Sequence, residues 1–237
     1  AVGAGGRKRR RRRVSFFDIS NYIALCGQRA LGHDRAMVGK LLSINAAVAR
    51  ETTIAGRVVL TAIGKRSVGG GPVAVRPLGI EGDEQADLTV HGGLSKAVYA
   101  YPAEHYPFWQ TVRAQAKAAA WEAPLPSGFL GENLTLSGLL EERAWIGDVL
   151  RFADCELAIS EPRYPCFKFN AAMGFNQAAK LMAANGWCGF YLAVRVSGSL
   201  RAGETFKIVP GPREVGIAEL FRAKMGGGKP RRQQDKE

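Results

Sequence analysis

One cysteine of this 237-residue chain has neighbours that suit chemistry. Cys166 follows Pro162 and Pro165 and lies between Arg163 and Lys168. The prolines stiffen the backbone before the cysteine, and two nearby cations favour a thiolate over a thiol. A rigid, electropositive cysteine on a loop suits a soft metal or a nucleophilic step. A buried structural cysteine is the alternative at this stage.

A second stretch, residues 78–93, surrounds polar groups with glycines. It holds Asp83 and ends in His91, Gly92 and Gly93. Glycine lets the backbone approach a ligand closely, and exposed N–H groups in such loops can hold phosphate. Read alone, the stretch is equally consistent with a turn and a surface or hydrogen-bonded core histidine.

A third stretch, residues 128–134, places Glu132 and Asn133 between a glycine and a leucine. The pair could aim a carboxylate and an amide into a pocket, or form a capped turn whose side chains bond local backbone. Residues 145–150 contain Gly147-Asp148, which we interpret as a structural turn before the cysteine segment.

Short strands joined by turns would position these groups. β-Branched content and turn residues predict strands over 38–44, 57–63, 73–75, 94–101, 145–152, 156–160, 187–196 and 205–209. Helices are expected from Pro102 into the Ala-rich residues 114–121, over 177–184, and from Gly216 to Lys224. Many short strands with few helices predict a mainly β fold of the α+β class, in the form of a closed or half-closed barrel.

Charge is concentrated at the two ends of the chain. Of the net +12, residues 1–36 hold nine basic and two acidic residues (+7), and residues 222–237 hold six and two (+4). Residues 37–221 hold 18 basic and 17 acidic residues (+1). The near-neutral middle argues against nucleic acid as the main partner. Binding through the tails would weaken steeply with salt.

The sequence also predicts three segments and a reducing compartment. Residues 1–36 are expected to be a basic, disordered extension; residues 37–213 form the domain, and residues 214–237 are a truncated helical start with a basic tail.

Four cysteines form no CxxC pair or zinc pattern, which favours a reducing compartment. Cys155 and Cys188 lie in apolar strand contexts and are predicted to be core. No apolar run reaches about 18 residues, so no membrane helix is expected.

Taken together and in order, the stretches resemble a known family. GxxGDxxxxxxxHGG over residues 79–93 is followed by YPxEHYxFW, FxGENL, GD and PRxPCxK. This series resembles the MOSC domain, named for the C-terminal domain of molybdenum-cofactor sulfurase, and within it the stand-alone YiiM-like type. The resemblance covers about residues 40–212. It implies a β-barrel similar to the pyruvate-kinase insert barrel.

The resemblance also implies a cofactor, a reaction and site residues. Cys166 would supply its thiolate to the molybdenum of Mo-molybdopterin. An N–O bond of an N-hydroxylated compound, such as 6-hydroxylaminopurine, a hydroxylamine or an amidoxime, would be broken with two electrons. The catalytic residues would be Cys166, His91 and Glu132, the last two as proton donors. The cofactor-binding residues would be Asp83, Gly92, Gly93, Asn133, Arg163 and Lys168, with Lys96 and Arg76 as further candidates.

Partners follow from the same resemblance. The chain lacks the cysteine cluster of an iron–sulfur centre, so electrons are expected from a separate flavin or iron–sulfur protein. A cytoplasmic detoxification role is expected, with no membrane partner. The family is also associated with pyridoxal phosphate.

Three alternatives stay open on the sequence. The protein could be a non-catalytic module that carries molybdenum cofactor or sulfur. It could bind nucleic acid through its basic tails. It could be a cysteine hydrolase or transferase, which would need Cys166 and His91 within hydrogen-bond reach.

Overall fold

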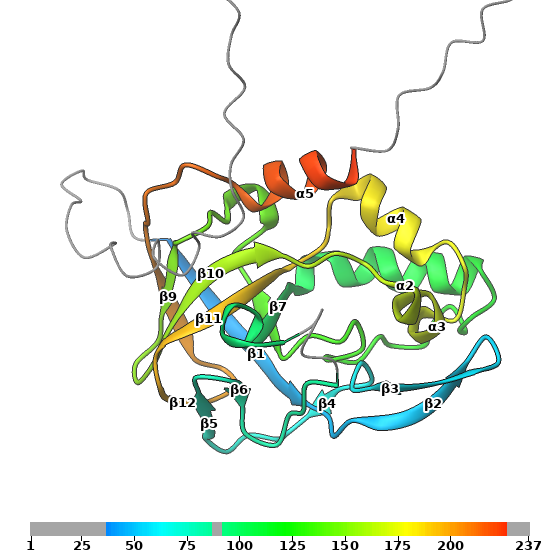
Figure 1. The fold of residues 1–237 in the computed structure, drawn as a ribbon, viewed down its shortest axis with the longest axis horizontal. Helices are drawn as coiled ribbons and strands as arrows, with labels where there is room; N and C mark the ends of the chain where they lie inside the picture. Colours follow the sequence, from blue (N-terminus) through cyan, green and yellow to red (C-terminus); the bar gives the residue numbers. More distant parts are fainter. Residues whose placement is uncertain (1–36, 87–91, 227–237) are drawn as a thin grey trace, which may run out of the picture.

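The structure is a computed structural model that describes residues 37–86 and 92–226. Its centre is a barrel formed by β1 (Val38–Ala46), β7 (Val98–Pro102), β8 (Leu134–Ser137), β9 (Val149–Arg151), β10 (Glu156–Pro162), β11 (Phe190–Val196) and β13 (Thr205–Val209). The strand order is β13-β9-β10-β11-β7-β8-β1, and a pairing of β1 with β13 closes the ring. Neighbours run antiparallel except β7 and β8, which are parallel. The predicted mainly β barrel is confirmed (Figure 1).

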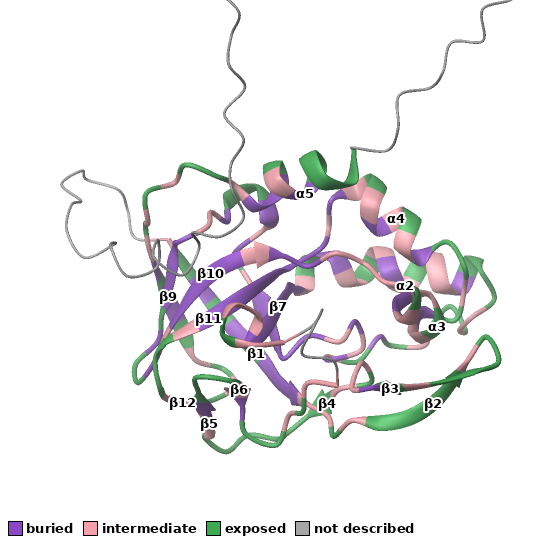
Figure 2. Ribbon diagram, in the orientation of Figure 1, coloured by how far each residue is buried: buried purple, intermediate pink, exposed green. Residues whose placement is uncertain are grey.

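The barrel interior is filled by alternate residues of its strands. In β13, Phe206 and Ile208 are buried while their neighbours Thr205 and Lys207 are exposed, as a period of two requires. The Phe206 ring lies over Gly39, where an added Cβ would stand 2.2 Å from a ring carbon. Glycine is therefore needed at this point of β1 for the barrel to close around the ring. β10 and β11 are buried over most of their length (Figure 2).

Smaller elements surround the barrel. They are the strands β4 (Arg66–Ser67), β5 (Val73–Arg76), β6 (Gly79–Ile80) and β12 (Gly198–Leu200), the hairpin strands β2 (Arg50–Ile54) and β3 (Arg57–Thr61), and the 3₁₀ helices η1 (Leu94–Lys96), η2 (Ala103–His105) and η3 (Glu141–Arg143). The α-helices are α2 (Tyr106–Gln115), α3 (Phe167–Met173), α4 (Ala178–Asn185) and α5 (Ile217–Met225). In Figure 1, α2, α3 and α4 group beside the barrel, and the β2–β3 hairpin runs beneath them.

The β2–β3 hairpin is exposed over most of its length (Figure 2). Its two-residue turn has positive φ at both Ala55 (50°) and Gly56 (76°). Two positive φ values are the mark of a type I′ turn, whose twist matches that of the strands it joins. The hairpin is therefore a regular antiparallel ribbon that stands outside the barrel.

Most predicted strands are confirmed, but several boundaries were wrong. Residues 94–97, predicted as strand, begin with the 3₁₀ helix η1, and β7 starts at Val98. The strand expected from Trp145 starts only at Val149, because Gly147 (φ 88°) turns the chain first. The elements β2, β4, β6, β8, β12 and α3 were not predicted, and β12 lies where a turn over 198–203 was expected.

The helices differ from prediction mainly at their ends. The helix expected from Pro102 starts as η2, becomes α-helical at Tyr106 and ends at Gln115, so it does not continue through the Ala-rich residues. Lys117 at φ 58° marks where the chain leaves the helical conformation. The predicted helices near 177–184 and after Gly216 are confirmed as α4 and α5. None of the helices in 37–86 and 92–226 has the length and apolar character to cross a membrane.

Candidate functional site

A pocket with a cavity volume of about 100 Å³ opens beside the barrel. The segment after β3, the turn after β6, η1 with the start of β7, and the start of α3 all contribute to its wall. Five of the predicted site residues line it: Asp83, Asn133, Arg163, Cys166 and Lys168. The remaining lining residues are Thr61, Ala62, Ile63, Lys65, Glu84, Gln85, Ala86, Lys96, Ala97, Tyr99, Gly131 and Tyr191.

Cys166 stands at the start of α3, on the residue that precedes the first helical turn. Its backbone is extended (φ −117°, ψ 173°), and the helix begins at Phe167. Its thiol is free and partly accessible, whereas Cys155 and Cys188 are buried. Burial raises the pKa of the Cys155 thiol to about 12 and also raises that of Cys188. Among the cysteines that the structure describes, Cys166 is thus the one placed for chemistry, and the core prediction for the other two is confirmed.

Arg163 is a buried cation next to the loop that carries Cys166. The residue is 4% exposed, and its guanidinium lies 4.8 Å from the Phe169 ring centroid and 5.5 Å from that of Tyr99. Burial acts to lower the pKa of Arg163, but electrostatic attraction to Tyr99, Tyr191 and Cys166 outweighs it and raises the pKa. The ion pairs found in the described chain give Arg163 no carboxylate partner. A buried cation of this kind favours negative charge next to it.

Asp83 ties together three parts of the pocket wall. Its Oδ1 accepts a hydrogen bond from the Ala47 amide at 2.9 Å and pairs with the Lys65 ammonium. Its Oδ2 accepts a bond from Asn133 Nδ2 at 2.8 Å, and Asn133 Oδ1 in turn accepts from the Tyr99 amide at 3.0 Å. Burial lowers the pKa of Lys65, an effect that Asp83 partly offsets. Asp83 therefore organises Lys65 and Asn133, and its carboxylate is already engaged.

Two further lysines stand on the pocket wall. Lys168 Nζ donates a hydrogen bond to the Leu60 carbonyl at 2.8 Å, which joins α3 to the β2–β3 hairpin. Lys96 Nζ lies 3.7 Å from Glu161 Oε2 and 5.9 Å above the Tyr191 ring. Together with Arg163 and Lys65 they give the lining four cations.

The histidine–glycine loop is only partly described. His91, predicted to be catalytic, lies outside the described residues. Gly92 and Gly93 are described but do not line the pocket. The Gly93 amide donates to Oε1 of Gln85 at 2.9 Å, and Gln85 itself lines the pocket. Gly93 is thus connected to the pocket only indirectly, through Gln85. Arg76, a further candidate, is exposed and lies 3.7 Å from Glu81, away from the lining.

Glu132 differs most from its predicted placement. It is 0% exposed and is not part of the lining. Its Oε1 accepts bonds from the Tyr106 hydroxyl, from the Gly128 amide at 2.7 Å and from Thr135 Oγ1 at 2.8 Å. Burial raises the pKa of Glu132, and these bonds oppose the rise. The structure gives Glu132 no contact with the pocket, so its geometry does not support a proton donor to a substrate.

Glycines allow the Gly-Glu-Asn turn to press against the segment after β3. Gly128 (φ 85°) and Gly131 (φ 90°) have left-handed backbone. A Cβ on Gly128 would stand 2.8 Å from the Lys65 carbonyl oxygen, and one on Gly131 would stand 2.9 Å from Ile63 Cγ1. This close approach brings Asn133 and Lys65 into one pocket.

Sequence reasoning missed several lining residues. Lys65 lies in a loop and pairs with Asp83, 18 residues further along the chain, whereas the hydrogen-bond partners of Gln85 are Leu78, Gly93 and Ala97. Tyr99 and Tyr191 read as ordinary strand residues, and only the β7–β11 register pairs them, with ring centroids 5.4 Å apart. Of these residues, Gln85 alone lies within a stretch that the sequence had marked as a candidate site, residues 78–93.

The donor set of the pocket suits a metal that arrives with its own ligands. In the described ranges there is no group of three or more His, Cys, Asp or Glu side chains that could hold a metal ion. The lining offers one soft sulfur donor beside several cations. Such a donor set suits the addition of one thiolate to an anionic metal cofactor.

Comparison with known proteins identifies the fold and the chain's relatives. The MOSC domain model matches residues 87–207. The uncharacterized protein YflK of Bacillus subtilis is 36% identical over 181 residues, which are 76% of this chain and 77% of YflK. Protein YiiM of Escherichia coli is 35% identical over 149 residues, 63% of this chain and 64% of YiiM.

A fungal relative and a solved structure extend the comparison. A protein of Gibberella moniliformis named "Reductase" is 32% identical over 179 residues, which make up 73% of this chain but only 30% of that protein. The crystal structure of YiiM from Geobacillus stearothermophilus superposes with a TM-score of 0.61 at 29% identity, covering 79% of this chain and 84% of the other. With its barrel, its ordered motifs and these matches, the chain belongs to the MOSC domain family.

Proposed function

We propose that this protein binds molybdenum cofactor and reduces N-hydroxylated compounds, with the thiolate of Cys166 as a ligand of the molybdenum. The observation that carries the proposal is the partly accessible Cys166 thiol in a pocket with the buried cation Arg163. Membership of the MOSC domain family supports a molybdenum-cofactor function. A relative named "Reductase" supports an oxidoreductase role.

The pocket residues fit the cofactor by their chemistry. Cys166 would supply the soft donor, and Arg163, Lys168 and Lys96 would balance the negative charge of a pterin phosphate. Asn133 Nδ2 donates to Asp83 and to the Asn45 carbonyl, and its Oδ1 accepts from the Tyr99 amide, so the second acceptor position of Oδ1 would face the pterin. When bound, the cofactor would supply the two-electron chemistry that breaks the N–O bond.

The chain itself contributes binding, charge and protons. Tyr99 and Tyr191 form an aromatic wall on which a planar base could pack. Arg163 and Cys166 line the same pocket, so the buried guanidinium would place positive charge beside the anionic cofactor. Lys65 is a proton source within the lining, because burial lowers the pKa of its ammonium. The overall reaction is R–NHOH + 2e⁻ + 2H⁺ → R–NH₂ + H₂O.

A separate flavin or iron–sulfur protein would deliver the electrons. We place the reaction in the cytoplasm, as a detoxification of N-hydroxylated bases. The free thiols of Cys155, Cys166 and Cys188 are consistent with a reducing compartment.

The test is to produce the protein in a host that makes molybdenum cofactor and to measure two quantities. These are the molybdenum content by elemental analysis, and the reduction of 6-hydroxylaminopurine with reduced methyl viologen. We expect stoichiometric molybdenum and turnover, and a loss of roughly 100-fold or more in turnover for Cys166→Ala, since even the outer contacts of a metal site are worth about 10–100-fold.

Cys188→Ala is the matched control, because it removes a sulfur that lies outside the pocket lining. It should keep both molybdenum and turnover. Equal molybdenum and equal turnover in Cys166→Ala would refute the thiolate ligand. Molybdenum without any turnover in the unmodified protein would instead favour the non-catalytic carrier.

A further inference from the structure

The β2–β3 hairpin has two faces of different character. Its register pairs Arg50 with Thr61, Thr52 with Val59 and Ile54 with Arg57. Because side chains alternate along a strand and paired residues share a face, these six residues form one face. Thr61 is buried and lines the pocket, so this face continues the pocket wall outward. We call it the inner face.

The outer face of the hairpin is set by the intervening pairs. Glu51 lies opposite Leu60, and Thr53 lies opposite Val58. Val58 is 66% exposed and Leu60 is 47% exposed, so the described chain does not cover this face. An isolated two-stranded ribbon is marginally stable in water. The ribbon is held to α3 by the hydrogen bond from Lys168 to Leu60.

The inner face carries unpaired positive charge. Arg50 and Arg57 are both exposed, and neither forms an ion pair with a carboxylate of the described residues. The Arg50 guanidinium would lie 3.4 Å from a Cβ added at Gly64, whose neighbours Ile63 and Lys65 line the pocket. The hairpin's one acidic residue, Glu51, is on the outer face. The wall that leads to the pocket is therefore cationic.

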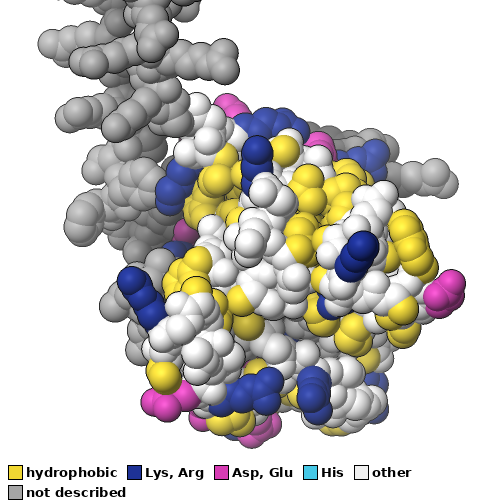
Figure 3. Space-filling model, turned by 90° about the vertical axis from the view of Figure 1, so that its right-hand side faces the viewer, with side chains coloured by type: hydrophobic (Ala, Val, Ile, Leu, Met, Phe, Trp, Pro, Cys, Tyr) yellow, Lys and Arg dark blue, Asp and Glu magenta, His cyan; other side chains and the backbone are white. Residues whose placement is uncertain are grey.

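Apolar surface borders the same wall. Phe167 follows Cys166 directly and is 58% exposed, so the reactive loop lies at the molecular surface. Figure 3 views the side of the molecule at which the hairpin ends, and hydrophobic side chains gather there, with Lys and Arg side chains along its lower part. An exposed apolar area rimmed by charge is typical of a protein interaction site.

We infer that the inner face of the hairpin, with Arg50 and Arg57, and the adjacent Phe167 form a docking surface for an acidic flavoprotein that delivers electrons to the pocket. The inference rests on the proposed reductase function and names the partner of that site. Cations on the inner face of the hairpin select a partner whose surface around its flavin is acidic, and they speed its approach.

A flavin is the carrier that matches the reaction. Each N–O bond requires two electrons and two protons. A fully reduced flavin holds both electrons and releases two protons on oxidation, so reduced FMN plus R–NHOH gives oxidised FMN, R–NH₂ and H₂O. One fully reduced flavin thus holds the electrons for one turnover, whereas a [2Fe–2S] cluster carries a single electron.

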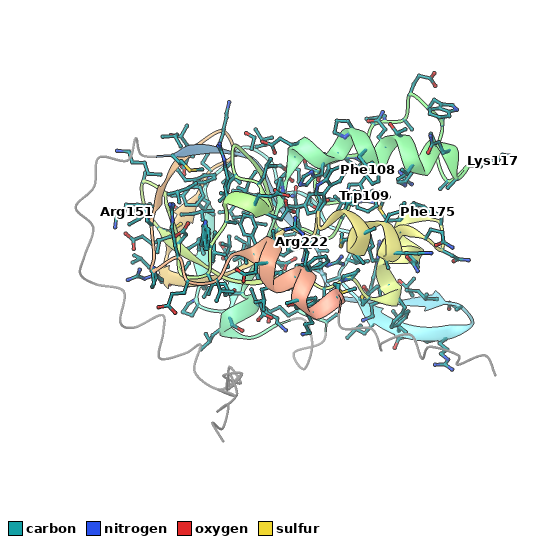
Figure 4. All side chains as sticks on the ribbon, turned by 90° about the horizontal axis from the view of Figure 1, so that it is seen from above. Phe108, Trp109, Lys117, Arg151, Phe175 and Arg222 are labelled. Atoms are coloured by element: carbon teal, nitrogen blue, oxygen red, sulfur yellow. The ribbon has the colours of Figure 1, made fainter. Side chains whose placement is uncertain are left out.

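The test uses the full-length, cofactor-loaded protein and flavodoxin as the acidic FMN protein. The variant is Arg50→Glu/Arg57→Glu. The control is Arg151→Glu/Arg222→Glu, which makes the same change in charge. Arg151 lies at the end of the molecule opposite the hairpin (Figure 4), and Arg222 is on α5. The basic tails are present in every protein, so they cancel in the comparison.

Two readouts separate docking from catalysis. The first is the Kd for oxidised flavodoxin by calorimetry, which requires no turnover. The second is kcat/KM for reduced flavodoxin beside the rate with reduced methyl viologen. We expect the hairpin variant to lose roughly tenfold or more in affinity and in flavodoxin-driven kcat/KM, with no fall in the methyl viologen rate. The control should behave like the unmodified protein.

Each other outcome is informative. Equal losses in variant and control would overturn the docking surface and indicate only a general effect of net charge. Activity with a reduced [2Fe–2S] ferredoxin but not with flavodoxin would overturn the choice of a flavin. No activity of the unmodified protein with methyl viologen, despite bound molybdenum, would refute the proposed function while leaving the calorimetric result to decide the docking surface.

Discussion

The pocket and the buried layer beneath it, which contains Glu132 and Cys188, are made from neighbouring segments. Only the pocket residues are accessible to a cofactor or substrate. Glu132 and Asn133 are consecutive, but Asn133 lines the pocket while Glu132 is enclosed by Tyr106, Gly128 and Thr135. Cys166 is partly accessible, whereas Cys188 is completely buried. The two cysteines have the same side chain, and Glu132 and Asn133 are both polar, so residue type does not indicate which member of each pair reaches the pocket. Accessibility and the neighbouring charges decide which member acts.

The largest expected effect tests the contrast between the cysteines. Iodoacetamide should alkylate Cys166 in the native protein roughly a thousandfold faster than Cys188, because the buried thiol has a raised pKa and must be exposed by an opening reaction. Peptide mass mapping over time measures each site separately. In denaturant the two rates should converge, and comparable native rates would show that the layer is not sealed.

A second prediction concerns Gly128, which lets the Gly-Glu-Asn turn pack against the segment after β3. Gly128→Ala should destabilise the fold by about 3 kcal/mol or more, since the residue has positive φ and its Cβ would meet the Lys65 backbone and Asn45. Gly203→Ala is the matched control, with φ 94° and no atom within 4 Å of the added Cβ. It should cost only about 1 kcal/mol. Urea unfolding of both variants gives the difference, and equal losses would contradict the close approach.

A third prediction separates binding from stability at Arg163. Arg163→Met replaces a buried cation that lacks a carboxylate partner in the described chain, so the cofactor-free protein should keep its stability within about 1 kcal/mol. Retention of molybdenum should nevertheless fall about 10–100-fold. Urea unfolding and elemental analysis measure the two quantities. A large loss of stability with normal retention would assign Arg163 to the core instead of the pocket.

The smallest expected effect is a pH dependence from Glu132. Its pKa is raised in the folded state by burial, so its contribution to stability is present below the pKa of the unfolded chain, 4.5, and is lost as pH rises through the folded value. Glu132→Gln should remove this component, so the variant should lose less stability between pH 4 and pH 8 than the unmodified protein does. Unfolding curves at several pH values measure it. An unchanged pH profile would mean that Glu132 does not titrate differently on folding.

Local patterns were sufficient for much of the fold. β-Branched alternation located β13 at 205–209, and Asn185-Gly186 located the C-terminal end of α4. The missed elements show the limit: β2 has the sequence Arg-Glu-Thr-Thr-Ile and is exposed throughout most of its length, so it lacks the apolar alternation by which strands are recognised. α3 spans only seven residues after a proline-rich loop, too short for a helical period to be visible.

The candidate site was predictable where one segment carries several of its groups. The cysteine stretch alone contributed Arg163, Cys166 and Lys168 to the pocket. Tyr191 and Lys65 reach the site only through pairing between distant segments, and no local signal marks them. Glu132 was misplaced because a one-residue step along the chain changes which side of the structure a side chain faces.

The closure of the barrel has a consequence for how this domain can be combined with others. β1 and β13 pair antiparallel, with Val38 opposite Lys207, so the polypeptide enters and leaves the barrel at the same end. β1 reaches the pocket region at its far end, where Ile44 pairs with Leu134. A module placed directly before β1 would start about 20 Å from the pocket region, one strand length away, and its linker would have to span that distance to present a redox group to Cys166.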